Sequence, residues 1–105
     1  MWCLFQYREF HDVPRSLVVR LPDSVLLLES SFEEGRDDYS DEYELYVLDE
    51  GVSLEGSWSG LARDGRRLGS VRVESLEFDE TRRRMVDLAP VRSMLEASGL
   101  YPPRG

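Results

Sequence analysis

The chain has 105 residues, of which 41% are apolar and 32% charged, and its 21 acidic and 13 basic residues give a formal net charge of −8. A chain of this size forms one domain around one core, so residues 1–105 are expected to be a single domain. The globular composition argues against a chain that is disordered throughout, and the negative charge disfavours nucleic acid as a partner.

Residue usage also bears on the cellular setting. The apolar start at residues 1–5 is too short for a secretory signal, and no apolar run approaches the ~20 residues of a membrane span, so we expect no membrane partner. All 13 basic residues are arginines, while lysine, isoleucine and asparagine, which have AT-rich codons, are absent; this usage indicates a GC-rich, bacterial genome. A lone cysteine suits a reducing compartment, and we expect the protein in the cytoplasm.

Few residues are suited to catalysis or metal binding. Cys3 and His11 would lie roughly 26 Å apart on one strand, so they cannot form a catalytic pair. One cysteine and one histidine do not supply the usual four ligands of zinc. The acids that begin at Asp37 lack the central glycine of an EF-hand calcium loop. We therefore expect no catalytic residue, no metal and no cofactor.

Alternation of apolar and polar residues predicts β-strands over most of the chain. The predicted strands, in chain order, cover residues 2–11, 16–21, 25–28, 43–47, 71–78 and 83–88, and turns are expected at 11–14, 22–24 and 79–82. The strand at 25–28 is apolar on both faces and is expected to be central. A change of phase predicts a bulge or bend near Glu74 and Ser75.

The end of the chain differs, because Val91, Met94 and Leu95 share one face at helical spacing. A helix from about Pro90 to Ser98 is therefore expected. The glycines spaced along residues 51–68 indicate a long loop with a short helical turn. The fold class is mainly β to α+β, with an antiparallel sheet or small open barrel of five or six strands and a C-terminal helix packed on it. The alternative is an α+β domain with a second helix at 52–62.

The negative charge belongs to one segment. Residues 29–50 hold ten acidic residues and one arginine, a net charge of −9, whereas the rest of the chain is nearly neutral. One interpretation is a solvated surface that keeps the protein soluble. The other is a docking surface for a basic protein partner, with tyrosines among the carboxylates. The residues predicted to contact such a partner are Glu33, Glu34, Asp37, Asp38, Tyr39, Asp41, Glu42, Tyr43 and Trp58.

Trp58 stands at the centre of a Gly-Ser-Trp-Ser-Gly sequence. The glycine spacing is that of a nucleophile elbow, but that motif needs a serine at its centre and a histidine downstream. Two interpretations remain open for Trp58: an exposed contact residue, or a lid folded back over the core. Two arginine clusters, at 63–67 and 82–84, are expected to offset the acidic segment rather than to bind phosphates.

The favoured function is a non-catalytic interaction module that docks a basic partner through the acidic segment at residues 33–44, of the inhibitor or immunity type. The alternative is a small-molecule-binding domain or enzyme that uses a carboxylate such as Glu44 in a pocket at the end of a barrel. A homodimer formed through the N-terminal strand is a third prediction.

Overall fold

The computed structural model describes residues 1–100 and is mainly β, with 43% strand and 16% helix. Within that range no helix has the length and apolar character needed to cross a membrane. The elements, in chain order, are β1 (Trp2–Leu4), β2 (Gln6–His11), β3 (Val13–Arg20), β4 (Val25–Glu29), β5 (Phe32–Glu33), β6 (Asp38–Tyr39), β7 (Glu42–Leu48), α1 (Leu61–Asp64), β8 (Arg66–Arg72), β9 (Glu77–Phe78), β10 (Met85–Asp87) and α2 (Arg92–Ala97), with short 3-10 helices at Val73–Ser75 and Ala89–Val91.

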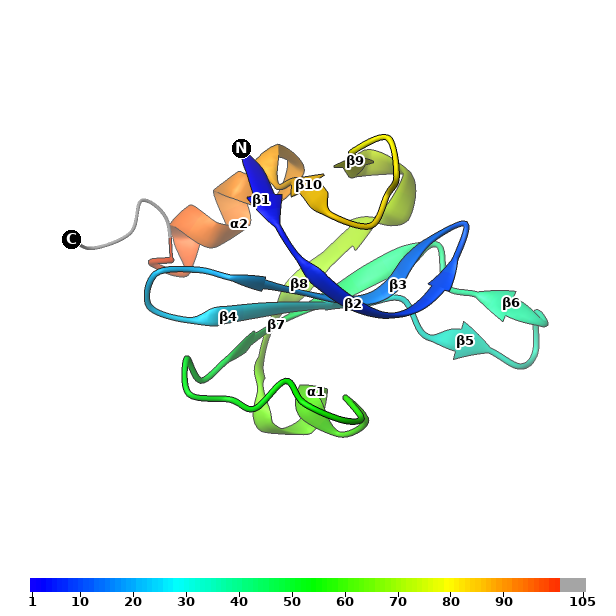
Figure 1. Cartoon of the computed structure of the whole chain (residues 1–105), viewed down its shortest axis with the longest axis horizontal. Helices are drawn as coiled ribbons and strands as arrows, with labels where there is room; N and C mark the ends of the chain where they lie inside the picture. The colour runs from blue at the N-terminus through cyan, green and yellow to red at the C-terminus, as the bar shows by residue number, and fades with distance from the viewer. Residues whose placement is uncertain (101–105) are drawn as a thin grey trace.

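A five-stranded antiparallel sheet forms the middle layer, in the order β2-β3-β4-β7-β8. A smaller sheet, in the order β1-β10-β9, lies over one face together with α2, and the loop that carries α1 covers the other face (Figure 1). The chain passes from the small sheet to the large one at Phe5, which joins β1 to β2. The prediction of an antiparallel sheet with a C-terminal helix is confirmed, and the sheet does not close into a barrel.

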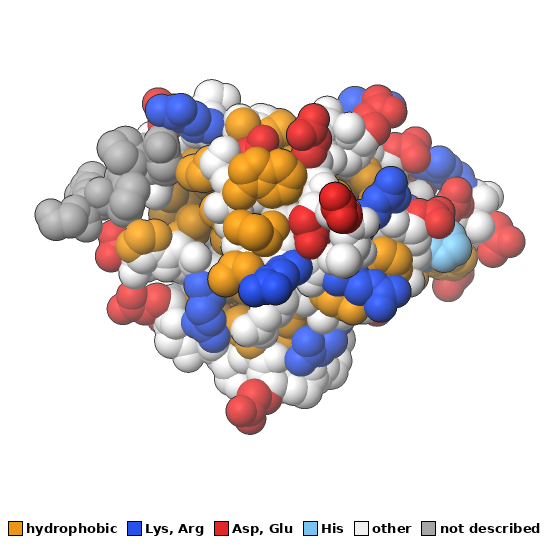
Figure 2. Space-filling model, turned by 45° about the horizontal axis from the view of Figure 1, so that its top comes forward, with side chains coloured by type: hydrophobic (Ala, Val, Ile, Leu, Met, Phe, Trp, Pro, Cys, Tyr) orange, Lys and Arg blue, Asp and Glu red, His pale blue; other side chains and the backbone are white. Residues whose placement is uncertain are grey.

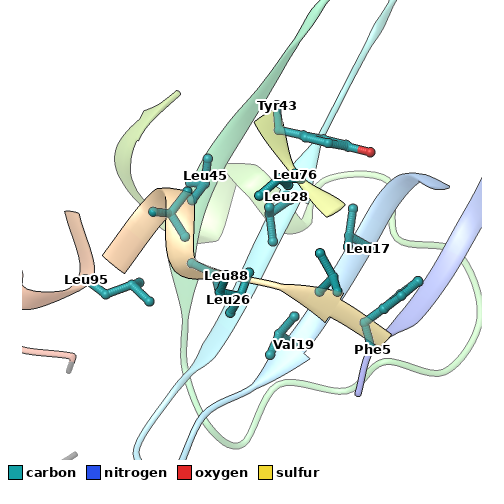
Figure 3. Close-up of a cluster of buried hydrophobic side chains, with 12 residues drawn as sticks. Phe5, Leu17, Val19, Leu26, Leu28, Tyr43, Leu45, Leu76, Leu88 and Leu95 are labelled. Atoms are coloured by element: carbon teal, nitrogen blue, oxygen red, sulfur yellow. The ribbon is translucent and has the colours of Figure 1, made fainter. Parts of the chain in front are cut away.

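The larger core lies between the two sheets and α2. Alternate residues of β3 and β4 meet the inward face of the small sheet, and Leu95 closes the core from α2 (Figure 3). The fully buried side chains of this core include Leu17, Val19, Leu26, Leu28, Tyr43, Leu45, Val86, Leu88 and Leu95. Burial of each such side chain stabilises the fold by about 1.5–3 kcal/mol before conformational entropy is set against it.

A second, smaller core fills the opposite face of the main sheet. Val18, Val25 and Leu27 point toward the loop after β7, which contributes Leu54 and Trp58. Because β4 is covered on both faces, its sequence is apolar at consecutive positions, and its predicted central place in the sheet is confirmed.

Three expectations about the elements were wrong in detail. The predicted N-terminal strand at 2–11 is two strands in different sheets. The chain pairs with β10 before Phe5 and with β3 after it, although Cys3, Phe5 and Tyr7 all face the larger core. The last strand of the main sheet begins at Arg66 instead of 71, since a bulge at Leu68 interrupts its alternation. The alternative helix at 52–62 is absent, and that loop holds only the one-turn α1.

Candidate functional site

The central part of the acidic segment, where no strand was predicted, forms a small hairpin. Its strands β5 and β6 pair through Phe32 with Tyr39 and Glu33 with Asp38. The hairpin projects beyond the main sheet, between the end of β4 and the start of β7 (Figure 1). Residues 31–42 are called the acidic hairpin from here on.

Most carboxylates of the acidic hairpin face water. Arg36 contacts Glu33 at 3.6 Å and Asp41 at 3.3 Å, which offsets part of the charge. The remaining acids of the hairpin, all exposed and without an ion pair to any residue in 1–100, are Glu34, Asp37, Asp38 and Glu42. The hairpin therefore carries unbalanced negative charge. Figure 2 shows acidic side chains gathered toward the end of the molecule that bears β5 and β6, and apolar side chains and arginines nearer the middle of that face.

Aromatic contacts fix the hairpin to the body of the protein. The ring of Tyr39 lies 5.5 Å from that of His11 and 5.0 Å from the guanidinium of Arg15. Phe32 packs edge-on against the other side of the Tyr39 ring, with 5.3 Å between centroids, and remains 50% exposed. Tyr39 thus anchors the hairpin, while Phe32 offers an apolar surface beside the carboxylates.

Two residues of the predicted docking set, Tyr43 and Trp58, are buried and lie outside the acidic hairpin. Tyr43 points into the larger core, where its side chain is fully buried and burial raises its pKa. Trp58 is also buried, and its indole N–H donates to the carbonyl of Leu54 at 2.9 Å. Its ring lies beneath the guanidinium of Arg8, at 4.6 Å, so Trp58 is the lid of the second core. The other seven predicted residues lie together on the acidic hairpin.

A groove of ~590 Å³ opens between the acidic hairpin and the loop that carries Trp58. The sheet contributes Ser16 from β3 and Glu29 from β4, while Phe32 comes from the hairpin. Arg8, Glu9, Arg15 and the serines at 30, 31, 57 and 59 complete its lining. The volume falls in the range of small ligand pockets, and the rings of Phe32 and Trp58 are the apolar side chains of the lining.

Glu29 is the chemically unusual residue of this groove. Its side chain is half-buried, and it makes no hydrogen bond or ion pair with residues 1–100. Burial raises the pKa of its carboxyl, and the nearby negative charge of Glu9 raises it further. The residue directly opposite on β3 is Ser16, whose hydroxyl is shielded from water and also has no partner in this range. The groove therefore presents the carboxylate of Glu29, which has no partner among residues 1–100.

The carboxylate named in the sequence-based alternative has a different environment. Glu44 pairs with Arg67 at 2.6 Å, and its side chain is 40% exposed. Its negative charge is therefore offset by Arg67, and the sheet does not close into the barrel at whose end it was expected to act. Among residues 1–100, no three His, Cys, Asp or Glu side chains lie close enough together to hold a metal ion.

Sequence reasoning missed Glu29 because the predicted strand stopped at Leu28. One signal was present: a strand with apolar residues on both faces runs directly into a charged residue, which then has to be covered or partly buried. The groove itself has no sequence signature, since its walls come from segments nearly thirty residues apart.

The arginine clusters have separate roles. Arg67 offsets the acidic segment by its pair with Glu44, as expected. Arg82 instead donates to the carbonyl of Asp12, and the guanidinium of Arg83 lies 4.6 Å from the ring of Phe10, so the second cluster packs against the β2–β3 turn. Beside it lies an apolar hollow of ~830 Å³ with the exposed side chains of Trp2 and Leu4.

Comparison of the chain with protein-family models, curated protein sequences and solved structures returned no match.

Proposed function

We propose that this protein is a non-catalytic interaction module that binds a basic protein partner through the acidic hairpin. The observation that carries the proposal is the placement of unpaired carboxylates on a hairpin that projects from the body, next to the half-exposed Phe32. Such a surface steers a cationic partner electrostatically, and an apolar residue at its edge adds short-range contact. An inhibitor or immunity protein is one concrete form of this function.

The cellular setting is part of the same proposal. We place the protein in a bacterial cytoplasm, on the strength of its arginine-only basic residues and its single cysteine. Cys3 is partly buried, and burial raises the pKa of its thiol, which lowers its reactivity.

Two triple variants with the same change of charge test the docking surface. The hairpin variant removes three exposed carboxylates whose side chains have no ion pair in residues 1–100: E34Q, D37N and E42Q. Asparagine suits position 37 because the backbone there is left-handed, with φ of 52°. The control variant removes three exposed carboxylates elsewhere on the surface: D23N, E50Q and E80Q.

The wild-type chain and both variants are used as bait in cells of the source organism, and recovered proteins are quantified by mass spectrometry. We expect a basic protein to be retained by the wild type and the control variant and lost with the hairpin variant. The affinity of the purified pair should fall at least about tenfold between 0.05 and 0.3 M salt, as screening of exposed charges requires. Equal binding by the two variants, or an affinity indifferent to salt, would refute the proposal.

A small-molecule-binding domain is the second candidate, and the half-buried, unpartnered Glu29 is the observation that favours it. This function would use the groove on the sheet face in place of a barrel end. It predicts saturable binding of a small organic cation by the wild type and the hairpin variant alike, measured by calorimetry.

Self-association is the third candidate. Trp2 and Leu4 are 49% and 62% exposed on β1, which is an edge strand of the small sheet. A dimer through this edge would bury both side chains. Sedimentation equilibrium of the wild type and of L4E tests this dimer: the wild type should dimerise and L4E should not. A wild type that stays monomeric at millimolar concentration would exclude it.

A further inference from the structure

We propose that the groove between the acidic hairpin and the Trp58 loop receives an arginine side chain of the basic partner, with its guanidinium at Glu29 and its stem against Phe32. The inference rests on the proposed function, because it supplies a specific pocket beside the surface that attracts the partner. It differs from that function in assigning one residue type and one binding position.

The acceptors of the groove are free. The carboxylate of Glu29 has no hydrogen-bond or ion-pair partner among residues 1–100. The carboxylate of Glu9, which lines the same groove, has no ion pair there either. Two carboxylates therefore line a groove in which no residue of this part of the chain supplies them with an ion-pair partner.

The two guanidinium groups of the groove are already engaged in hydrogen bonds. Arg8 donates to three backbone carbonyls, those of Tyr7, Leu54 and Gly56, at 3.1–3.3 Å. Arg15 donates to the carbonyl of His11 at 2.9 Å and to the Ser30 hydroxyl at 3.2 Å. An anionic ligand would find these guanidinium groups engaged and two carboxylates nearby. A ligand that donates hydrogen bonds and carries positive charge fits the groove best.

An arginine matches this site better than a lysine for two reasons. Its planar guanidinium can donate two parallel hydrogen bonds to one carboxylate, and it is less strongly hydrated than an ammonium, so partial burial beside Glu29 costs less. It also stacks on aromatic rings, and Phe32 offers a ring that is 50% exposed at the rim of the groove.

Binding should be linked to pH. The charged groups that face Glu29 are Glu9 and Arg8 from β2, Arg15 from β3 and Glu44 from β7, the last paired with Arg67. The hairpin and the Trp58 loop add only serines and aromatic rings at the groove. Because a cation favours the ionised carboxylate of Glu29, the affinity should rise as the pH rises through the pKa of that group and fall below it.

The test uses three blocked tripeptides, acetyl-Gly-X-Gly-amide with X as arginine, lysine or the uncharged citrulline, titrated into the full chain at neutral pH. Amide chemical shifts in ¹⁵N NMR spectra report both the site and the dissociation constant. We expect the arginine peptide to shift the signals of Ser16, Glu29 and Ser57–Ser59, the lysine peptide to bind several-fold more weakly, and the citrulline peptide to leave them unchanged.

The decisive variant is E29Q, which keeps the shape of the side chain and removes its charge. It should weaken binding of the arginine peptide about tenfold and abolish the pH dependence, while E50Q, the same change at a distant exposed site, should do neither. Unchanged binding by E29Q, or shifts confined to other parts of the surface, would overturn the inference. Tighter binding of free argininamide than of the peptide would overturn it too, in favour of a small-molecule site.

The same variants separate this inference from the function on which it rests. Loss of partner binding in the hairpin variant with full binding in E29Q would refute the arginine pocket and leave the docking function standing. Equal partner binding by the hairpin and control variants would refute the docking function, whatever the tripeptides do.

Discussion

The hydroxyl of Tyr43 donates a 2.6 Å hydrogen bond to the carbonyl oxygen of Pro14. The bond joins β7 to β3 beyond the end of β4, which stops at Glu29 opposite Ser16. It therefore supplies a link between two strands that no sheet hydrogen bond joins, directly beneath the base of the acidic hairpin.

Removal of this hydroxyl tests the link. Y43F leaves the buried carbonyl of Pro14 without its donor and should lower the free energy of unfolding by about 1–2 kcal/mol. Y46F is the control, because the Tyr46 hydroxyl has no hydrogen bond with residues 1–100, and its effect should stay within about 0.5 kcal/mol. Urea denaturation measures both, and equal losses would contradict the assigned role of the Tyr43 hydroxyl.

Two neighbouring serines should respond oppositely to alanine. The hydroxyl of Ser16 is buried without a partner, so S16A removes an unsatisfied group and should be neutral or stabilise the fold by up to about 1 kcal/mol. The hydroxyl of Ser30 donates to the Ser40 carbonyl and accepts from Arg15, so S30A should destabilise the fold by about 1–2 kcal/mol. Thermal unfolding of S16A, S30A and the wild type measures both changes in stability. A marked loss of stability in S16A would mean that the Ser16 hydroxyl makes a hydrogen bond in the folded protein.

The raised pKa of Glu29 predicts the pH dependence of stability. The folded protein holds this proton more tightly than the unfolded chain does, so the contribution to stability is complete below the ordinary glutamate pKa of about 4.3 and is lost as the pH rises through the folded pKa. E29Q has no such proton. Relative to the wild type, its free energy of unfolding should therefore increase from pH 4 to pH 8, whereas that of E50Q should stay parallel to the wild type. A difference that stays constant with pH would disprove the burial of this carboxylate.

The two tryptophans report the two sides of the structure separately. Trp2 is 49% exposed, whereas Trp58 is 4% exposed beneath Arg8. W2F should therefore leave blue-shifted fluorescence that acrylamide quenches poorly, and W58F should leave red-shifted, readily quenched fluorescence. Similar quenching in the two variants would show that the Trp58 loop does not cover the sheet.

Local alternation was sufficient to predict most of the large sheet. The two-sided apolar run at 25–28 correctly placed β4 at its centre, and the helical spacing around Leu95 predicted α2. The break predicted near Glu74 is the 3-10 helix that ends β8. Each of these features depends on neighbours within a few residues, which is why the sequence alone could reveal them.

The missed features depend on distant parts of the chain. The change of sheet at Phe5 leaves the alternation undisturbed, because the same side of the chain faces the core before and after it. The strands β5 and β6 are two residues long, too short for a periodic pattern. Likewise, Tyr43 was predicted to contact a partner, and only the packing of the small sheet, which comes from distant parts of the chain, shows that its side chain is completely buried.

The pairing of β1 with β10 joins Trp2 to Asp87, close to the two ends of the described chain. The strands of the main sheet, by contrast, pair with partners at most about thirty residues away. On the ribosome, the large sheet can therefore assemble while β1 still waits for its partner, and the neighbouring core residue Phe5 stays uncovered until residues 85–87 have emerged. The small sheet can thus close only after β10 has been synthesised, because β10 is the strand that lies between β1 and β9.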